Sequence, residues 1–556
     1  MVTVQGGSVI RNDLDSSSET VSEHRTERGH SMKILYDNGQ VYTGRLPLAE
    51  AFVVEDDRFL FAGSQEEAES FAGPDALRVN MEGRFVCSGF NDSHMHLLNY
   101  GHMLGAAQLA GYPSLERMLR YLKDFATQHP PREGAWLIGR GWNQDSFADE
   151  KRMPDRHDLD QISTDLPICI VRCCGHCLVV NSRALELAGI SGDASPDGRF
   201  FDSAMNRIFH VIPVPSDREI REMIRTACKA LNSYGITSCQ TDDYCAFRQI
   251  PWQRIHEAYK DLEDAGKLTV RICEQCNFTA PEELRAFIKA GNLTGTGSPL
   301  FRVGPLKLMG DGSLGSRTAF LSHPYQDAPD TCGSLVLSPD TLTEMIVCAH
   351  KAGMQTAVHA IGDACLDKVL AALDKALTEY PRPDHRHGIV HCQITRPDQL
   401  DTICRQKLHI YAQSIFLDYD SGIVVDRVGR ELAATSYQWK TLLKKGITVS
   451  NGSDCPVETP NVLAGIQCAV TRAPLLGTAG PYLPDQAFSV QEALDSYTCQ
   501  GAYASFEERS KGQIQEGMLA DFVILNQNPF MVSEDKLGKI SVCATYLGGR
   551  KVFSIF

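Results

Sequence analysis

The chain has 556 residues, of which 43% are hydrophobic, and it carries a formal net charge of −15. Because a nucleic-acid partner requires clustered Lys and Arg to neutralise its phosphates, this acidic balance argues against one. The sequence holds no run of about 18 apolar residues, so we expect neither a transmembrane helix nor a membrane partner.

The first residues and the cysteines bear on the compartment in which the protein works. Residues 1–31 are polar and lack the apolar core of a secretory signal, so we predict a disordered tail there. The 19 cysteines are odd in number, and several, such as Cys87, Cys169 and Cys404, lie in apolar runs. We therefore expect free thiols and a cytoplasmic location.

Short strand-like segments occupy both ends of the chain, in residues 32–88 and 515–556. They lie at residues 33–36, 51–54, 59–62, 84–87, 521–525, 542–547 and 551–553. A long region in which strands and helices alternate separates the two groups. We therefore predict that both chain ends pair into one small β-sandwich domain.

Residues 89–514 alternate short apolar strands with helices, which is typical of a parallel α/β fold. After the strand that precedes His94, strand candidates lie at residues 235–239, 268–273, 304–309, 355–359, 388–391, 410–413 and 446–449. This number suits a (β/α)8 TIM barrel, whose chemistry lies at the carboxyl ends of the strands. An open, doubly wound sheet is the alternative.

The segment from about residue 105 to 215 is too long for one connection between a strand and a helix. It contains Pro130-Pro131, Pro154 and several aromatic residues. Long insertions of this kind are usually functional lids. We predict a cap, inserted after the first barrel strand, that covers the mouth of the barrel.

The triplet His94-Met95-His96 directly follows an apolar strand. Residues i and i+2 of an extended segment point to the same face, so the two imidazoles can converge on one metal ion. Taken alone, such a pair more often belongs to two surface histidines.

Three later strand candidates also lead into a side chain that can bind a metal. His359 and His391 each end a strand, and Asp454 follows the strand at residues 446–449. Because the carboxyl ends of barrel strands meet at one mouth, these side chains should converge with His94 and His96. The sequence therefore predicts a metal site of four histidines and one aspartate.

Four further stretches carry a family resemblance. They are Gly141-Trp142-Asn143-Gln144, Gly175-His176 followed by Asn181-Ser182, the block from Lys307 to Ala319, and the segment from Gly517 to Phe522. From about residue 33 to its end, the chain resembles the amidohydrolase superfamily. Within it, the chain is most similar to the amidohydrolase-3 branch of YtcJ-like proteins, which includes N-substituted formamide deformylases.

The resemblance implies a role for each strand-end residue. His94 and His96, from the first barrel strand, would bind metal, as would His359 and His391 from the fifth and sixth strands. Asp454, from the eighth strand, would bind metal and act as the general base toward water.

The resemblance also implies the cofactor. It is a divalent metal, one or two ions, and imidazole-rich ligation suits Zn2+ while leaving iron and manganese open. Lys307 would end the fourth strand, and in related binuclear sites this lysine carries a CO2-derived carbamate that bridges two metals. A structural lysine in a salt bridge is the alternative. The pair Cys273 and Cys276 lacks a second pair at zinc spacing, so we interpret it as structural.

Five residues are weaker candidates for contacts with a small-molecule substrate. The resemblance places His176 over the substrate, and Trp142 could line the pocket with its ring. Asp311 and Arg317 lie in the loop after the fourth strand, and Gln413 ends the seventh strand candidate. A packed histidine and a core tryptophan are the alternatives for His176 and Trp142.

The expected function is hydrolysis of a C–N bond, foremost in an N-acyl or N-formyl amine, by water that a metal activates and Asp454 deprotonates. Deamination or cyclic amide hydrolysis at the same site is one alternative. A non-catalytic relative that binds a small molecule is another. The oligomeric state stays open, with a homodimer as one option.

Overall fold

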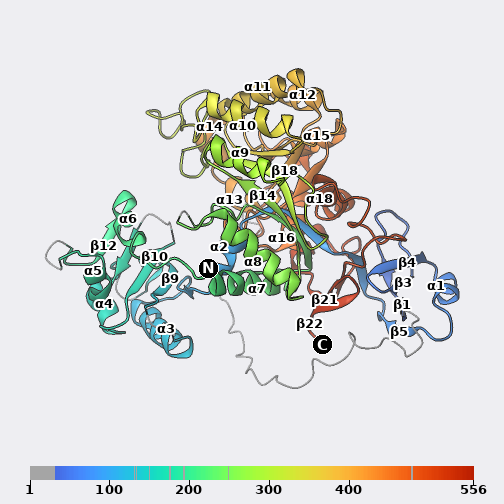
Figure 1. The fold of residues 1–556 in the computed structure, drawn as a ribbon, viewed down its shortest axis with the longest axis horizontal. Helices are drawn as coiled ribbons and strands as arrows, with labels where there is room; N and C mark the ends of the chain where they lie inside the picture. Colours follow the sequence, from blue (N-terminus) through green and yellow to red (C-terminus); the bar gives the residue numbers. More distant parts are fainter. Residues whose placement is uncertain are drawn as a thin grey trace.

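The computed structural model describes residues 32–556 except 131, 133, 149–150, 174–176, 192–194, 248 and 477–479 (Figure 1). The predicted tail at residues 1–31 lies outside the described residues. The four β-sheets divide the structure into three parts: a central barrel, a β-sandwich to one side of it, and a cap to the other.

Eight parallel strands form the central sheet in the order β19-β18-β17-β16-β15-β14-β13-β7. Their bounds are β7 (Phe90–Met95), β13 (Ile236–Thr241), β14 (Arg271–Asn277), β15 (Phe301–Met309), β16 (Thr356–Ala360), β17 (Gly388–His391), β18 (His409–Ala412) and β19 (Val449–Asn451). The segment after β19 returns to β7, where Asp454 N donates to His94 O at 2.8 Å. The two edge strands therefore meet, which confirms the (β/α)8 barrel over an open, doubly wound sheet.

Helices connect these strands on the outside of the barrel. They include α7 (Asp217–Ser233), α8 (Trp252–Asp264), α9 (Pro281–Lys289), α10 (Pro339–Lys351), α11 (Asp363–Glu379), α12 (Pro397–Gln406), α15 (Trp439–Lys444) and α16 (Val462–Thr471). In α7, a capping box between Ser216 and Glu219 starts the helix. Ile220, Ile224 and Leu231 are buried at helical spacing, so one face of α7 packs on the barrel.

The two chain ends build a β-sandwich, as predicted. One sheet has the order β4-β3-β1-β5 and the other β2-β6-β20-β21-β22. Their bounds are β1 (Lys33–Asp37), β2 (Gln40–Val41), β3 (Ala51–Glu55), β4 (Arg58–Gly63), β5 (Leu77–Asn80), β6 (Phe85–Ser88), β20 (Phe522–Leu525), β21 (Val542–Leu547) and β22 (Arg550–Ser554), with α1 (Gln65–Ala72) beside the first sheet. The rings of Phe52 and Phe522 lie 5.0 Å apart between the sheets. A buried pair of Arg271 and Asp521 joins this domain to β14 of the barrel.

The insertion after the first barrel strand forms a unit of its own, here called the cap, which stands to the left of the barrel in Figure 1; that it covers the barrel mouth stays a prediction. Its sheet has the order β12-β11-β10-β9-β8. The strands are β8 (Ala107–Gln108), β9 (Leu137–Trp142), β10 (Ile168–Arg172), β11 (Cys177–Val180) and β12 (Arg199–Phe201), and the helices are α3 (Leu115–Gln128), α4 (Arg156–Asp160), α5 (Ser182–Leu187) and α6 (Asn206–Phe209). Apolar clusters of its own fill the cap, one around Met118 and Trp142 and the other around Leu178 and Ile208.

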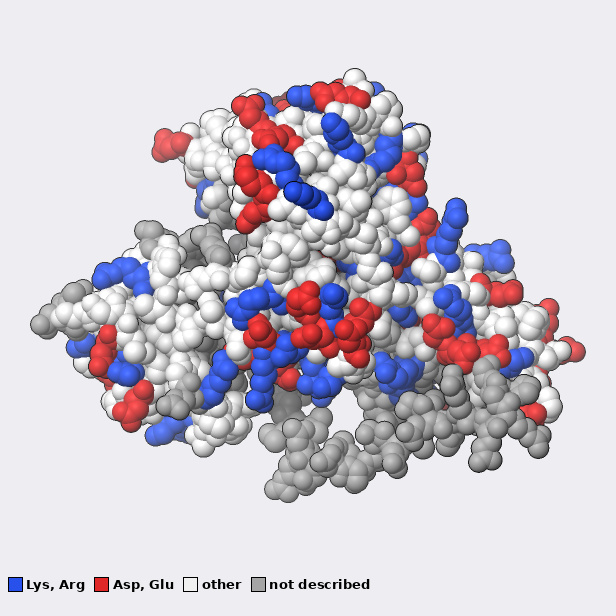
Figure 2. Space-filling model, in the orientation of Figure 1, with Lys and Arg blue, Asp and Glu red and all other residues white. Residues whose placement is uncertain are grey.

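The outer surface of the barrel carries charges of both signs. Figure 2 shows Lys and Arg interspersed with Asp and Glu over α7 and α8. Ion pairs link these helices, from Arg221 to Asp261 at 2.8 Å and from Arg254 to Asp217 at 2.7 Å. Within the described part of the chain, every helix is too short or too polar to cross a bilayer.

Candidate metal centre

The first histidine pair lies where β7 meets the segment after β19. Besides the bond from Asp454 N to His94 O, His96 N donates to Cys455 O at 2.7 Å. These main-chain bonds join the end of the first barrel strand, β7, to the segment that follows the last barrel strand, β19. They bring the carboxylate of Asp454 to the histidines although the residues are 358 positions apart.

A buried aspartate fixes this junction. Asp92 Oδ2 accepts from Ser453 Oγ at 2.5 Å, and its Oδ1 accepts from Ser453 N at 3.0 Å and from His94 N at 3.3 Å. Burial raises the pKa of Asp92 to about 7, although the bonds from Ser453 and His94 oppose the rise. Gly452 is needed for the close approach, because a Cβ there would lie 2.5 Å from His94 N. The junction therefore has little freedom to shift the two side chains apart.

His94, His96 and Asp454 offer ligand atoms that all lie within 4.8 Å of one another. Asp454 Oδ1 is 2.9 Å from His96 Nε2 and 3.4 Å from His94 Nε2. The side chain of His94 is 1% exposed and that of His96 is 24% exposed, so solvent reaches the cluster from the side of His96.

The second pair of predicted histidines lies beside the first. His391 Nε2 is 3.0 Å from His359 Nδ1, and their ring centroids are 4.4 Å apart. The ring of His391 is also 5.8 Å from that of His94. The four imidazoles predicted from strand ends therefore form one continuous group at the barrel mouth.

Lys307 completes the group from β15, together with an aspartate that the sequence analysis missed. Lys307 Nζ is 2.9 Å from Asp242 Oδ2 and 3.4 Å from His94 Nε2, and its side chain is 1% exposed. The other oxygen of Asp242 contacts His96 Nδ1. Asp242 directly follows β13, so the rule that identified Asp454, a carboxylate just after a barrel strand, would also have identified Asp242.

Two glutamines orient histidines of the group. Gln275 Oε1 is 2.7 Å from His94 Nδ1, and Gln413 Oε1 is 2.7 Å from His391 Nδ1. An amide oxygen can only accept, so both histidines carry their proton on Nδ1 and present a lone pair on Nε2. Such partners fix the orientation of ligating histidines. The structure thus gives Gln413 a contact with His391; its contact with substrate stays a prediction. Gln275 was not among the site residues predicted from the sequence.

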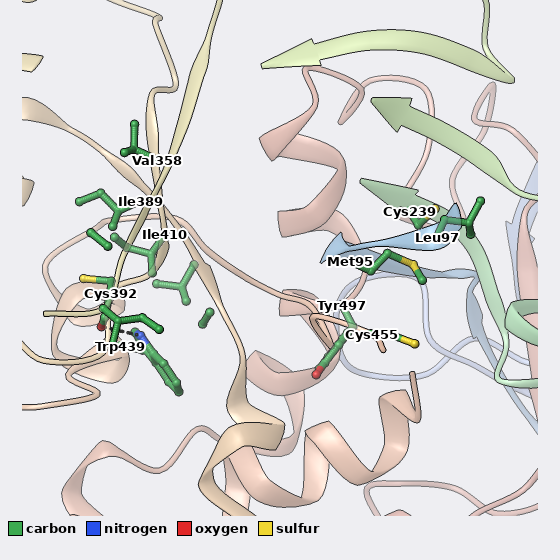
Figure 3. Packing of buried hydrophobic residues seen from close by; sticks show 14 of the residues in the cluster. Met95, Leu97, Cys239, Val358, Ile389, Cys392, Ile410, Trp439, Cys455 and Tyr497 are labelled. Carbon is green, nitrogen blue, oxygen red and sulfur yellow. Dashed lines mark hydrogen bonds between the residues drawn. The ribbon is translucent and has the colours of Figure 1, made fainter. Parts of the chain in front are cut away.

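The backbone of the centre is strained at three positions. His391, Cys392 and Asp454 have φ values of 74°, 49° and 57°, in the left-handed region that side chains rarely adopt. Trp439 Nε1 donates to the carbonyl oxygens of His391 at 3.0 Å and Cys392 at 3.2 Å. Figure 3 shows Trp439 beneath Cys392, near Ile389 and Ile410 from two adjacent strands. The buried core therefore holds the strained turn that presents His391.

The charges of the group are strongly coupled. Burial raises the pKa of Asp454, but the neighbouring imidazoles of His94 and His96 outweigh burial and hold the pKa well below its usual value. Burial lowers the pKa of His96, but Asp242 and Asp454 outweigh it and raise this pKa to about 10. Burial also lowers the pKa of His391 and, together with Lys307, that of His94. Asp454 is therefore ionised at neutral pH, and Asp242 and Asp454 together favour a positive charge at the position of His96.

Asp311 and Arg317, two of the weaker substrate candidates, make contacts within the protein. Asp311 is fully buried and accepts from the backbone N–H groups of Phe320, Ile361 and Gly362. It thereby ties the loop after β15 to the loop after β16. Arg317 forms two hydrogen bonds to Asp327, at 3.1 and 2.8 Å. Contact of either residue with substrate stays a prediction.

The remaining candidates lie in the cap. Trp142 is 0% exposed, and its Nε1 donates to Ile170 O at 3.3 Å within the apolar core of the cap. This position matches the alternative of a core tryptophan; a contact with substrate stays a prediction. His176 lies outside the described residues. Cys273 and Cys276 are both free and buried, in line with a structural role.

The chemistry of the donor set fits a divalent cation. Imidazole nitrogens and a carboxylate oxygen are the usual ligands of zinc and of similar first-row metals. His94, His96 and Asp454 supply both kinds of donor in one cluster, and the low pKa of Asp454 keeps its oxygens available. His359, His391, Asp242 and Lys307 surround this cluster with further nitrogen and oxygen atoms.

Comparison with known proteins agrees with this chemistry. The model of the amidohydrolase family matches residues 78–553. The chain is 32% identical to the putative amidohydrolase YtcJ of Bacillus subtilis, over 94% of this chain and 99% of that protein. It is 24% identical to the N-substituted formamide deformylase of Arthrobacter pascens, over 93% of this chain and 97% of that protein. The crystal structure of an uncharacterized metal-dependent hydrolase from Pyrococcus furiosus matches with a TM-score of 0.74 and 29% identity, over 89% of this chain and 99% of that one. The chain therefore belongs to the amidohydrolase family and is a metal-dependent hydrolase of its YtcJ-like branch.

Proposed function

We propose that the protein hydrolyses the C–N bond of a small amide, an N-acyl or N-formyl amine. The observation that carries this proposal is the carboxylate of Asp454, ionised and held 2.9 Å from His96 Nε2 and 3.4 Å from His94 Nε2. A relative that covers nearly the whole chain is named an N-substituted formamide deformylase, which supports an amide as the substrate class.

A divalent cation, which we propose is Zn2+, would be held by His94, His96 and Asp454, with His359 and His391 beside it. When bound, it would supply the Lewis acidity that lowers the pKa of water to about 7 and polarises a carbonyl group. The chain's own residues supply the proton transfers. Asp454 would accept the proton of the attacking water and later deliver it to the nitrogen of the leaving amine.

Lys307 can be present in one of two chemical states, an ammonium ion or a CO2-derived carbamate. As an ammonium ion it pairs with Asp242, as the distance of 2.9 Å indicates. As a CO2-derived carbamate it would be an anion next to Asp242, and only the charge of bound metal would compensate the repulsion. We propose that the carbamate forms together with a second metal ion. Native mass spectrometry should then find the added mass of CO2 in metal-loaded protein and not after chelation; carbamate-free protein with two metals would overturn this.

Activity tests the proposed reaction directly. Protein reconstituted with Zn2+ should release amine from N-formyl and N-acyl amines, and a chelator should abolish the release. Asp454→Asn should remove the activity with the fold intact. If the protein released ammonia from an aminated ring and left every amide intact, the proposed amide hydrolysis would be wrong and deamination would take its place.

A further inference from the structure

A cavity of about 860 Å³ lies between the cap and the barrel. This volume is within the range of small-molecule sites, roughly 300–1,000 Å³. Its described walls come from α2 (Leu97–Leu104), from β9, β10 and α6 of the cap, from residues 212–215, and from the segments after β13 and after β19. Neither the sequence motifs nor the family resemblance identified it.

The walls of the cavity continue from the residues of the metal centre. Helix α2, which contributes Asn99 and Met103, begins directly after His96. Phe247 lies in the segment that follows Asp242, and Pro456 is two positions after Asp454. Three of the strand ends that build the centre therefore continue into segments that line the cavity.

Most of the cavity wall is apolar. Met103, Ile138, Val171, Phe209 and Phe247 contribute apolar side chains from both the cap and the barrel. An apolar wall favours an apolar group of the ligand, because burial removes its surface from water. The part of the substrate that enters the cavity is therefore largely apolar.

One charged side chain stands out in this wall. Of the described lining residues, Arg140 of β9 is the single Lys, Arg, Asp or Glu. It is exposed, and its side chain has no hydrogen bond or ion pair to any described residue. Other arginines of the cap are paired, such as Arg152 with Asp158 and Arg199 with Asp197. Burial and the charge of Arg140 lower the pKa of nearby His102, so this ring adds no positive charge at neutral pH.

We propose that this cavity selects amides that carry a carboxylate on an apolar body, with the carboxylate bound by Arg140. The chemical class is that of N-acylated or N-formylated amino acids with an apolar side chain. A guanidinium group suits a carboxylate because it can donate two parallel hydrogen bonds. The choice of substrate rests on the proposed amide hydrolysis, whereas the binding of an apolar carboxylate does not.

Equilibrium binding tests the cavity without any reaction. With the metal-loaded protein, 4-phenylbutanoate should bind about tenfold or more tightly than 4-phenylbutanol, because a hydrogen bond to a charged group is worth that factor. Arg140→Gln should abolish this preference. Arg120→Gln is the matched control, since Arg120 is an exposed arginine of the cap paired with Glu116. Arg140→Lys should restore part of the preference.

The outcomes separate the two proposals. Loss of the preference in Arg140→Gln but not in Arg120→Gln supports the cavity. Equal binding of both compounds, or a preference that survives in Arg140→Gln because the carboxylate binds the metal, overturns it. In activity assays, kcat/KM for N-formylphenylalanine should exceed that for N-formylphenethylamine, and Arg140→Gln should remove the difference. Hydrolysis of neither amide, with Arg140-dependent binding intact, would refute amide hydrolysis and leave the cavity standing.

Discussion

At the barrel mouth the charged side chains are buried and bonded to one another. In the cavity beside the cap, by contrast, the charged side chain is exposed and has no hydrogen-bond or ion-pair partner among the described residues. Asp454, Asp242 and Lys307 each contact at least one histidine of the centre. The side chain of Arg140 has no hydrogen bond or ion pair with a described residue. The charged groups of the barrel mouth are therefore held in place before any ligand binds, whereas the charge of Arg140 is available to pair with a ligand.

The largest expected effect tests the barrel half of this contrast. Asp454→Asn keeps the shape of the side chain but removes the proton acceptor. We expect kcat to fall by about 10³-fold or more, since general base catalysis contributes roughly 10²–10⁴ and the same oxygens contact both histidines. Asp401→Asn, which removes an exposed carboxylate paired with Lys445 on the outside of the barrel, is the control and should keep full activity. Comparable rates for Asp454→Asn and the control would remove Asp454 from the reaction.

Two buried tryptophans offer a matched test of how separate the two regions are. Trp439 lies under the metal centre and Trp142 lies in the cap, and both are almost fully buried. Replacing either with Phe removes a hydrogen bond from the indole N–H to a backbone carbonyl oxygen, which costs about 1 kcal/mol of unfolding free energy. Trp439→Phe should also weaken zinc binding, because Trp439 holds the carbonyl of His391. Trp142→Phe should leave zinc affinity unchanged, as measured by competition with a chelator. An equal loss of affinity in both variants would mean that cap and centre are coupled.

A smaller effect is expected from the glutamines that orient the histidines. Gln413→Leu removes the acceptor for His391 Nδ1–H and should lower zinc affinity or kcat by about 10–100-fold. Gln413→Glu keeps an oxygen acceptor and should recover most of the loss. If Glu and Leu at this position behaved alike, Gln413 would act through packing and not through His391.

The sequence predicted the parts of this structure that repeat a simple rule. Strands and helices alternate at regular spacing, so the barrel was predictable, and each imidazole of the centre directly ends or follows a barrel strand. The rule of a carboxylate directly after a barrel strand would have selected both Asp242 and Asp243, which follow β13. Only the three-dimensional structure separates them: Asp242 faces Lys307 and His96, whereas Asp243 accepts from Leu98 N and Tyr259 Oη.

Contacts that depend on the fold of loops were harder to predict. Gln275 contacts His94 across 181 positions of sequence, so no local pattern around Cys273 and Cys276 predicts this contact. An aromatic side chain such as Trp142 is common in ligand pockets, but its ring lies in the apolar core of the cap. Neither periodicity nor spacing encodes which side of the cap sheet faces the barrel, so the cavity around Arg140 could be found only in the structure.

The pH dependence of the metal-free protein tests the charge coupling at the barrel mouth. In the folded chain the pKa of His96 is about 10, above the value of about 6.5 for an unfolded histidine. Its contribution to stability is therefore fully present below about pH 6.5 and is lost as the pH rises toward about 10. Urea unfolding of chelated protein should give a smaller free energy at high pH, and His96→Gln should show a weaker decline over the same range. Bound metal competes with the same proton, so metal-loaded protein should also lack this decline. If the free energy of unfolding declined equally in the chelated protein and in His96→Gln, other groups would cause the decline. The proposed charge coupling at the barrel mouth would then be wrong.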